Sequence, residues 1–354
     1  MKVFIRSAAS ISPQKTFGQA SFLTEAVEYI GNRLTCIEPD YSGIIDTKLI
    51  RRMSRIIKMG VAAAAASLQE AKVAMPDAII TGTAYGCLED TEVFLKKMIQ
   101  NKEEMLTPTA FIQSTHNTVS AQIALMLKCH RYNNTFVNRG FSFESAILDA
   151  VLMLEENETN NVLAGGVDEI IDTSHTILSR FGLYKTEPLS NFDLIRSGTK
   201  GTMDGEGAAF FVLTNQSSED NQACLDAIST FYKPQSITET EKNILSFLEK
   251  QSTDISKIDL IITGMNGDCR GDEIYVRLSH SIFKNKNQVC YKHLCGEYPT
   301  STAFALWLAT NIFKKQSIPA ILGQKPESGR SLQRILIYNH HQNLHHSLFL
   351  LSAC

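Results

Sequence analysis

The alternation of apolar and polar positions predicts strands that alternate with helices along the whole chain. One six-residue pattern occurs twice, as DAIITG at Asp77–Gly82 and as DLIITG at Asp259–Gly264, with five identical residues. Each copy follows a predicted helix and precedes a glycine-containing loop, as expected for a duplicated α/β unit. The repeat predicts two related halves, residues 1–215 and 216–354, with the polar stretch Asn215–Asn221 at their junction.

A second pattern, at residues 134–166, predicts a strand that turns abruptly into a helix. The strand is expected at Thr135–Asn138, the turn at Arg139–Phe141 and the helix at about Ser142–Glu155. Unpaired N–H groups at the start of a helix favour negative charge, and enzymes hold activated Ser or Cys nucleophiles on such turns. The predicted apex is Gly140, so this turn carries no nucleophile at its centre.

Composition narrows the possible functions. The chain has 354 residues, 44% of them hydrophobic, and a formal net charge of −3. Nothing suggests the basic cluster of a nucleic-acid-binding protein or the long apolar run of a membrane span, so neither partner is expected. The first residues lack the apolar core of a signal peptide, which predicts a cytoplasmic protein.

Cysteine and histidine content give no reason to expect a metal or a cofactor. The eight cysteines include no C-x-x-C pair and are expected to be reduced and buried. Four histidines, at 340, 341, 345 and 346, crowd one segment near the end of the chain. We interpret them as surface or loop residues rather than as metal ligands, because no cysteine lies nearby.

Several short motifs follow one another in an order that belongs to a known family. They are Arg51-Arg52-Met53, GTAYGCLEDTE at 82–92, AGG at 164–166, Asn191-Phe-Asp193 and Gly205-Glu-Gly207. With them the chain resembles the β-ketoacyl-acyl carrier protein synthase family, the condensing enzymes of fatty-acid and polyketide synthesis, over essentially its whole length. The resemblance implies a thiolase-like α/β fold, in which two duplicated halves form a five-layer α/β/α/β/α sandwich, and it implies no cofactor.

The family's nucleophilic cysteine corresponds to Gly140. Asn117 lies 23 residues before Gly140 and Ala150 lies ten residues after it, and both spacings match the family. Because two independent counts reach the same residue, a slip of register does not explain the missing cysteine. Glycine cannot carry an acyl group.

The two family histidines are also replaced. The resemblance places Asn266 at the first histidine position and Glu297 at the second, whereas the family's lysine is retained as Lys292. Glu297 and Lys292 lie in residues 287–302, which we predict to form a loop. The family's glycine-rich loop is replaced by residues 339–346. A carboxylate at Glu297 would repel the malonyl carboxylate whose loss drives condensation. These losses together predict that condensation is absent.

The resemblance therefore implies a non-catalytic subunit of the chain-length-factor type, as in clusters that make aryl polyene or flexirubin-like pigments. Such a subunit pairs with an active ketosynthase as a heterodimer and shapes its acyl tunnel, and the acyl carrier protein acts through that partner. A homodimer is the other possible assembly. An active 3-oxoacyl-acyl carrier protein synthase, which condenses acyl and malonyl units, is an alternative function.

The same resemblance implies which residues border the tunnel or the dimer interface. They are Phe111, Ile112, Thr115, Thr135, Phe136, Val137, Asn138 and Arg139. For the first three, packing in the core of the chain is an equally good explanation. Arg139 could occupy the space of the missing cysteine or reach the site of the partner.

Two further alternatives keep a nucleophile in the chain. Ser142 lies two residues beyond the apex and could serve an acyltransferase or hydrolase, although a serine there is also typical of the first turn of a helix. Cys87 or Cys295 could be a displaced nucleophile, although a small buried cysteine is the commoner role. No histidine has an obvious place as a base for Ser142.

Overall fold

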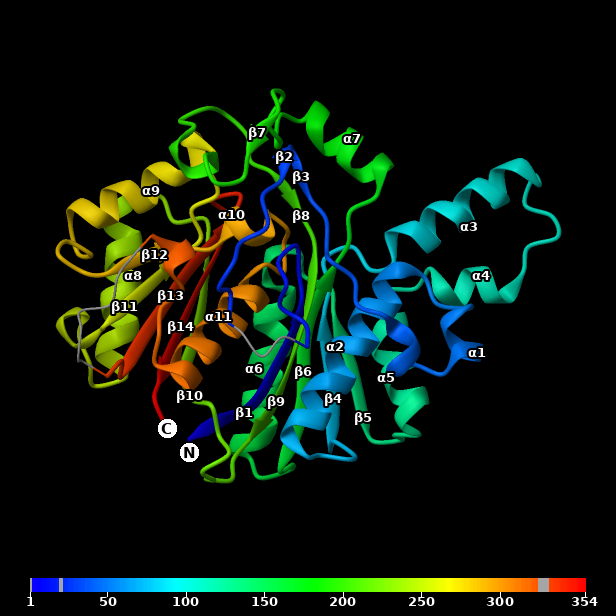
Figure 1. Ribbon diagram of the computed structural model, residues 1–354, viewed down its shortest axis with the longest axis horizontal. Coiled ribbons are helices and arrows are strands. Elements are labelled where there is room, and N and C mark those ends of the chain that lie inside the picture. Colours follow the sequence, from blue (N-terminus) through cyan, green and yellow to red (C-terminus); the bar gives the residue numbers. More distant parts are fainter. Residues whose placement is uncertain (1, 19–21, 324–330) are drawn as a thin grey trace.

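The computed structural model describes residues 2–18, 22–323 and 331–354 (Figure 1). The long strands of the first half of the chain are β1 (Val3–Ile11), β4 (Ala78–Gly82), β5 (Tyr132–Phe136), β6 (Asn161–Asp168) and β9 (Gly207–Thr214). Those of the second half are β10 (Ala223–Tyr232), β11 (Leu260–Thr263), β12 (Gln288–Cys290), β13 (Arg334–His341) and β14 (His345–Ser352). All ten belong to one sheet, in the order β12-β11-β13-β14-β10-β1-β9-β6-β4-β5. Two short pairs lie outside it, β2 (Ile30–Gly31) with β7 (Leu189–Ser190) and β3 (Arg33–Leu34) with β8 (Asp204–Gly205).

The two halves of the sheet have the same internal arrangement. In the first half, β4 pairs in parallel with β5 and β6, and β9 pairs antiparallel with β6 and β1. In the second half, β11 pairs in parallel with β12 and β13, and β14 pairs antiparallel with β13 and β10. The antiparallel pair β1–β10 joins the halves. The two copies of the repeated IITG pattern, β4 and β11, occupy equivalent places, while the boundary between residues 215 and 216 stays a prediction.

Helices form the remaining layers. The α-helices are α1 (Thr47–Ile50), α2 (Arg55–Ala71), α3 (Leu88–Gln100), α4 (Pro108–Gln113), α5 (Thr118–Leu127), α6 (Ser142–Glu155), α7 (Asp172–Arg180), α8 (Ile237–Lys250), α9 (Cys269–His280), α10 (Lys292–Cys295) and α11 (Thr302–Lys315). Short 3₁₀ helices are η1 (Tyr41–Gly43), η2 (Arg139–Phe141), η3 (Leu194–Arg196), η4 (Ile255–Lys257) and η5 (Ala320–Leu322). Helices α3 and α4 project from the body on the side of β5 (Figure 1).

The strand pattern divides the core into layers, because successive side chains of a strand point to opposite faces of the sheet. One cluster joins α2 and α5 to the outer face of the first half of the sheet. Another joins α8 and α9 to the outer face of the second half. The largest cluster contains α6 and α11 and the inner faces of both halves. The order is therefore helices, sheet, helices, sheet, helices, which is the predicted five-layer sandwich.

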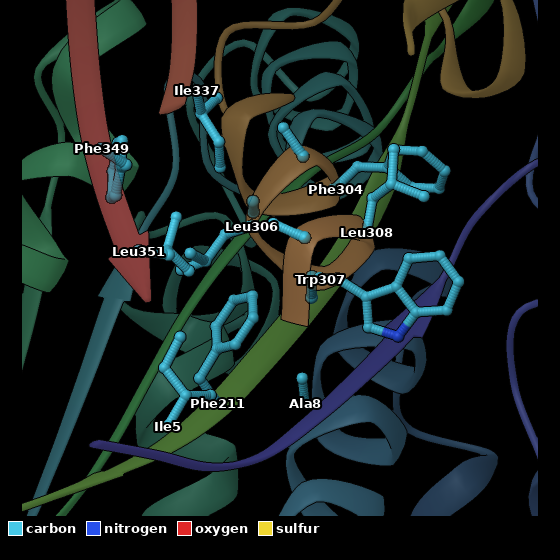
Figure 2. Packing of buried hydrophobic residues seen from close by; sticks show 14 of the residues in the cluster. Ile5, Ala8, Phe211, Phe304, Leu306, Trp307, Leu308, Ile337, Phe349 and Leu351 are labelled. Carbon is cyan, nitrogen blue, oxygen red and sulfur yellow. The ribbon is translucent and has the colours of Figure 1, made fainter. Parts of the chain in front are cut away.

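The middle layer is the most apolar part of the molecule. Phe211 of β9, Trp307 of α11 and Phe349 of β14 converge there (Figure 2). Alternation is strict in β9, where Phe211 faces this layer and Phe210 faces the layer of α2. The two helices in the middle hold the two half-sheets at a fixed separation, and the loops at the strand ends are positioned by this packing.

The candidate residues follow the carboxyl ends of the parallel strands. Gly140 comes after β5, Asn266 after β11 and Lys292 after β12, and His341 is the last residue of β13. Side chains that leave parallel strands at the same edge of a sheet come close together, and this edge is where α/β proteins bind ligands. The fold thus assembles one site from segments that are far apart in the sequence.

Candidate functional site at the carboxyl ends of the parallel strands

The turn between β5 and α6 is held by its own hydrogen bonds. Arg139 has a left-handed backbone conformation, with φ of 48°, so the strained residue of the turn is Arg139 rather than Gly140. The hydroxyl of buried Ser142 donates to the carbonyl of Arg139 at 2.8 Å and accepts from the N–H of Asn138 at 2.8 Å. These bonds occupy the hydroxyl in closing the turn, and they favour the structural interpretation of Ser142 over the nucleophile.

The space beside Gly140 is filled by histidines. A Cβ atom at Gly140 would lie 2.7 Å from Cβ of His341 and 2.9 Å from Cβ of His345. Phe141 also packs edge-on against the His345 ring, with ring centroids 4.7 Å apart. Arg139 is exposed and does not fill this space. The β13–β14 hairpin therefore closes over the turn at Gly140.

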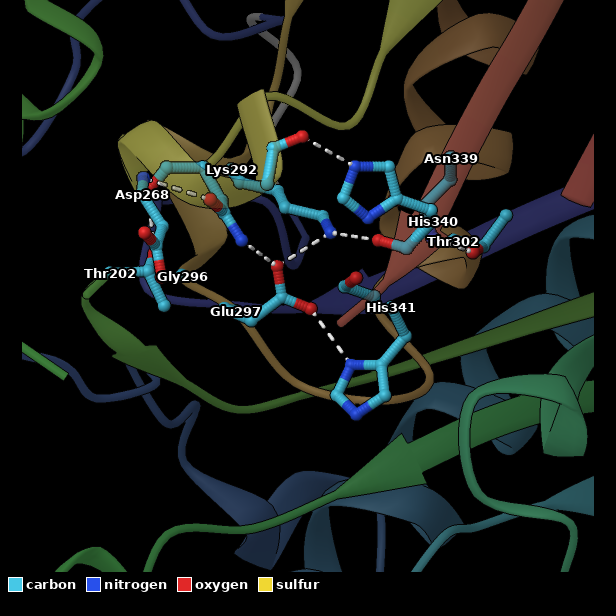
Figure 3. A network of polar contacts seen from close by, with 12 residues as sticks. Thr202, Asp268, Lys292, Gly296, Glu297, Thr302, Asn339, His340 and His341 are labelled. Carbon is cyan, nitrogen blue, oxygen red and sulfur yellow. Dashed lines mark hydrogen bonds and ion pairs between the residues drawn. The ribbon is translucent and has the colours of Figure 1, made fainter. Parts of the chain in front are cut away.

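The carboxylate of Glu297 forms the centre of a buried polar network (Figure 3). Its Oε2 atom accepts from Lys292 Nζ at 2.6 Å and from Asn266 Nδ2 at 2.6 Å, and its Oε1 atom lies 3.0 Å from His341 Nδ1. Burial alone would raise the pKa of Glu297, but Lys292 and His341 lower it to about 2. Glu297 is therefore an ionised carboxylate at neutral pH, with donors on both oxygens.

Local structure positions each member of this network. Lys292 opens the one-turn helix α10, within the segment that we predicted to be a loop. Gly296 ends that turn with φ of 76°, and its tight fit against Gly205 leaves no room for a side chain. The loop of Asn266 is fixed by Asp272, which accepts from the N–H groups of Asn266 and Gly267 at 2.9 and 2.7 Å.

The two candidate cysteines are unsuited to nucleophilic chemistry. Cys87 and Cys295 are both fully buried. Burial raises the pKa of each thiol well above its ordinary value, so the reactive thiolate is suppressed. Both cysteines fill space in the core.

The histidines near the end of the chain are not surface or loop residues, contrary to our expectation. His340, His341 and His346 are buried, and all four lie on β13 and β14. Burial lowers the pKa of His346 to about 4, and its Nδ1 atom lies 3.0 Å from the Tyr338 hydroxyl. The sequence analysis missed this burial because histidine is a polar residue that is seldom fully buried. Within the described residues, no group of three or more His, Cys, Asp and Glu side chains has an arrangement that would hold a metal ion.

Glu144 is a second buried carboxyl group whose environment the sequence did not reveal. It lies in the first turn of α6 with only 1% of its surface exposed, and neither oxygen makes a hydrogen bond of good geometry to any described residue. Burial raises its pKa to about 7, although the nearby Thr302 hydroxyl opposes the shift. A helix start is favourable for an anion, but burial is the larger effect here.

A cavity of about 430 Å³ lies beside the Glu297 network. Its walls come from the loop after β4, the end of β6, helix α7, the loop after β11 and the β13–β14 turn. Glu297, Asn266 and His341 all line it, whereas Gly140 does not. Gly140, Asn266 and Glu297 therefore converge, two at the cavity wall and one behind His341.

The predicted interface residues lie away from this cavity. Phe111 and Ile112, on α4, are 57% and 59% exposed, so packing in the core of this chain does not explain them. Thr115 follows α4 and hydrogen-bonds to the Ile112 carbonyl. The others follow one another along β5, the edge strand of the sheet, and its exit, namely Thr135, Phe136, Val137, Asn138 and Arg139. Val137 is 46% exposed.

Comparisons with known proteins support the fold. Residues 40–194 match the model of the family described as "Beta-ketoacyl synthase, N-terminal domain". This segment of the chain is similar to the N-terminal domain of β-ketoacyl synthases. A search of curated protein sequences found no significant match. None of the helices in the described ranges is both long and apolar enough to cross a membrane.

Solved structures extend this likeness to the whole chain at the level of the fold. A β-ketoacyl synthase from Burkholderia phymatum STM815 has a TM-score of 0.82 and 14% identity. The ishigamide ketosynthase/chain length factor has a TM-score of 0.81 and 16% identity. AntDE:AntF, a type II polyketide synthase acyl carrier protein in complex with its ketosynthase, has a TM-score of 0.73 and 15% identity. Each match covers 100% of this chain and 99% of the other, which confirms the predicted thiolase-like fold.

The close approach of the hairpin makes a first prediction. Gly140→Ala should lower the free energy of unfolding by about 1–3 kcal/mol, because the added methyl group meets Cβ atoms that cannot move without shifting the backbone. Denaturant unfolding measures the change. Gly43→Ala is the matched control, since nothing lies within 4 Å of its Cβ position, and it should change stability by less than about 0.5 kcal/mol. A Gly140→Ala protein as stable as the parent would show that the hairpin does not press on the turn.

The burial of Glu144 makes a second prediction, about pH. Its folded-state pKa of about 7 lies above the ordinary value of 4.5, so its contribution is complete below pH 4.5 and is lost as the pH rises through 7. Between pH 5 and pH 8 the parent should lose on the order of 3 kcal/mol more stability than Glu144→Gln. Urea unfolding at both pH values measures this difference. As a control, Glu249→Gln, at an exposed position on α8, should show the same pH dependence of stability as the parent. Parallel pH profiles for the parent and Glu144→Gln would refute the raised pKa of Glu144.

Proposed function

We propose that this chain is a non-condensing ketosynthase-like subunit, of the chain-length-factor type, that pairs with an active ketosynthase and shapes its acyl tunnel. The observation that carries the proposal is the Glu297 network. An internal carboxylate occupies the Lys292 and Asn266 donors at the place where the family has a catalytic histidine. A malonyl carboxylate or an enolate would have to displace Glu297 from a buried ion pair, which is unfavourable by several kcal/mol.

The other half of the condensing chemistry is missing as well. Acyl transfer needs a nucleophile on the turn, and Gly140 offers none. The histidines over Gly140 leave no room for the acyl carbon that such a nucleophile would hold. The site thus differs from a condensing site in two independent ways, and both support a subunit that leaves the chemistry to a partner.

The exposed surface supports pairing with another protein. Strand β5 is an edge strand, and its unpaired N–H and C=O groups can extend the sheet into a second subunit. Exposed apolar side chains flank it on both faces of the sheet, Leu125 on α5 and Leu148 with Leu152 on α6. Met105 and Phe111, at the projecting α3–α4 segment, add further exposed apolar surface. Exposed apolar side chains gathered beside an edge strand are typical of a protein interface.

A heterodimer is a better functional explanation than a homodimer. Two copies of this chain would contain no condensing site, whereas an active ketosynthase would supply one. The ishigamide ketosynthase/chain length factor, which shares the fold, is a pair of this kind by its description. The ketosynthase of AntDE:AntF is held in a complex with an acyl carrier protein. We infer that a carrier protein reaches this chain through its partner.

Co-expression tests the pairing. With the ketosynthase encoded nearest to it, the chain should purify as a stable heterodimer that elongates acyl chains from malonyl-acyl carrier protein, while this chain alone should form no product. Mass spectrometry of the carrier-bound products measures elongation. Replacing the cysteine of the partner by alanine should abolish activity of the complex. Product formed by this chain alone would establish the alternative, an active 3-oxoacyl-acyl carrier protein synthase. A stable homodimer that never pairs would also refute the proposal.

Phe111 provides a test of the tunnel. If Phe111 borders the far end of the acyl tunnel, Phe111→Ala should give longer acyl products from the complex, because the smaller side chain leaves room for further extension. Its ring is exposed in the single chain, so the free energy of unfolding should change by less than about 0.5–1 kcal/mol. Phe181→Ala, at an exposed phenylalanine after α7, is the matched control. An unchanged product length for Phe111→Ala would show that Phe111 does not border the tunnel.

A further inference from the structure

Cys224 and Cys354 bring two thiols into direct contact at the end of the sheet opposite to the candidate site. Their Sγ atoms lie 3.3 Å apart, although the residues are 130 positions apart along the chain. Cys224 is on β10, where it pairs with Phe4 of β1 on one side and with Ser352 of β14 on the other. Strand β14 starts at His345, beside the candidate site, so Cys354 follows its far end (Figure 1).

The two cysteines differ in their exposure to solvent. Cys224 is only 2% exposed, whereas Cys354 is exposed. Our expectation that the cysteines are buried is therefore wrong for Cys354, and also for Cys269 on α9. A disulfide requires the two sulfur atoms to approach to about 2.05 Å. Cys354 can make this small movement, because it lies two residues beyond the last pair of the strand, Ser352 with Cys224.

The surroundings favour a thiolate in this pair. A thiolate accepts a hydrogen bond but cannot donate one, so the Cys354 thiol is the donor when Cys224 is ionised. This hydrogen bond lowers the pKa of Cys224 to about 7, helped by the charge of Lys2 and opposed by burial and by Asp226. About half of the Cys224 thiols are therefore ionised at neutral pH. The thiolate is the form of cysteine that reacts with oxidants.

A cavity of about 440 Å³ gives small molecules access to the pair. Its walls include Cys354 together with the polar residues Arg6, Asn221 and Gln222. Hydrogen peroxide resembles water in size and in its hydrogen bonding, so a polar cavity suits it. A larger oxidant cannot reach Cys224 directly, because that side chain is buried.

We propose that Cys224 and Cys354 are an oxidation site, at which a peroxide converts the two thiols into a reversible disulfide. The Cys224 thiolate attacks one oxygen of hydrogen peroxide, the O–O bond breaks, and the released hydroxide takes up a proton to become water. Cys224 is then a sulfenic acid. The Cys354 thiol attacks the sulfenic sulfur and gives its proton to the departing hydroxide, so the S–S bond forms and a second water leaves. The two sulfurs lose two electrons, which reduce one peroxide to two waters.

The disulfide closes the second half of the chain into a covalent ring. Cys224 is the second residue of β10 and Cys354 follows β14, so the ring contains nearly all of that half. A crosslink over so many residues lowers the entropy of the unfolded chain and thereby stabilises the folded one. The modification goes beyond the pairing role, because it requires neither a partner subunit nor the candidate site.

Oxidation of the reduced, full-length chain with a small excess of hydrogen peroxide tests the site. Free thiols are counted after unfolding, and mass spectrometry of proteolytic peptides identifies the crosslink. Two of the eight thiols should be lost, with one crosslink between the peptides of Cys224 and Cys354, and dithiothreitol should restore both. The midpoint of thermal unfolding should rise by about 2–6 °C on oxidation.

Two variants separate this disulfide from unspecific oxidation. Cys354→Ser should form no crosslink, and peroxide should not raise its unfolding midpoint. Cys269→Ser, which removes the other exposed cysteine, should form the crosslink and gain stability as the parent does. Both substitutions are at exposed positions, so both variants should fold like the parent.

Three results would overturn the proposal. They are oxidation of Cys269 while Cys224 and Cys354 keep their thiols, disulfides of Cys354 that form only between chains, and loss of the crosslink in Cys269→Ser. The pairing experiment is independent, because it measures complex formation and elongation rather than the state of these thiols. Failure of the oxidation test would therefore leave the proposed pairing role untouched, and failure of pairing would leave the oxidation site standing.

Discussion

A buried, ionised carboxylate is unfavourable unless partners surround it, and Glu297 imposes this requirement on the site. Its side chain is 8% exposed and that of Lys292 is fully buried, so neither charge is stable in this place without the other. Removing one partner from such a pair typically destabilises a protein by about 3–5 kcal/mol. Satisfying Glu297 also needs Asn266 after β11 and His341 at the end of β13. The carboxylate thereby ties three distant segments of the second half of the chain together.

The same interaction accounts for the other unusual features of the site. With Nδ1 held by Glu297, His341 remains at the end of β13, where its Cβ atom lies against Gly140. The turn between β5 and α6 consequently has no space for the nucleophile that such turns present in enzymes. Lys292 and Asn266, which would otherwise be free to bind an anion, are used within the protein. His341 therefore links the two features, because it contacts both Gly140 and Glu297.

The fold around this site is the fold of ketosynthase structures. The whole chain superimposes on ketosynthase structures with TM-scores up to 0.82 at 14–16% identity. Such a fold depends on the alternation of apolar residues in the strands and on the packing of α6 and α11 between the half-sheets, which many different sequences can satisfy. Catalysis depends instead on a few specific side chains. The edge strand β5 belongs to this scaffold and does not depend on the side chains of the Glu297 network.

The sequence alone determined the fold class, because the repeated IITG pattern and the order of the motifs survive in the primary structure. It also singled out Gly140, Asn266 and Glu297 by their spacing along the chain, and their correspondence to the family's catalytic positions stays a prediction. Other features depend on contacts between distant segments. Residues 287–302 contain the helix α10, which is too short to give a periodic pattern in the sequence. His340, His341 and His346 are buried, although histidine is usually a surface or intermediate residue. Only the tertiary structure could bring His341 against Glu297 and Gly140, because β13 and β5 lie in different halves of the sheet and meet through the packing of the middle layer.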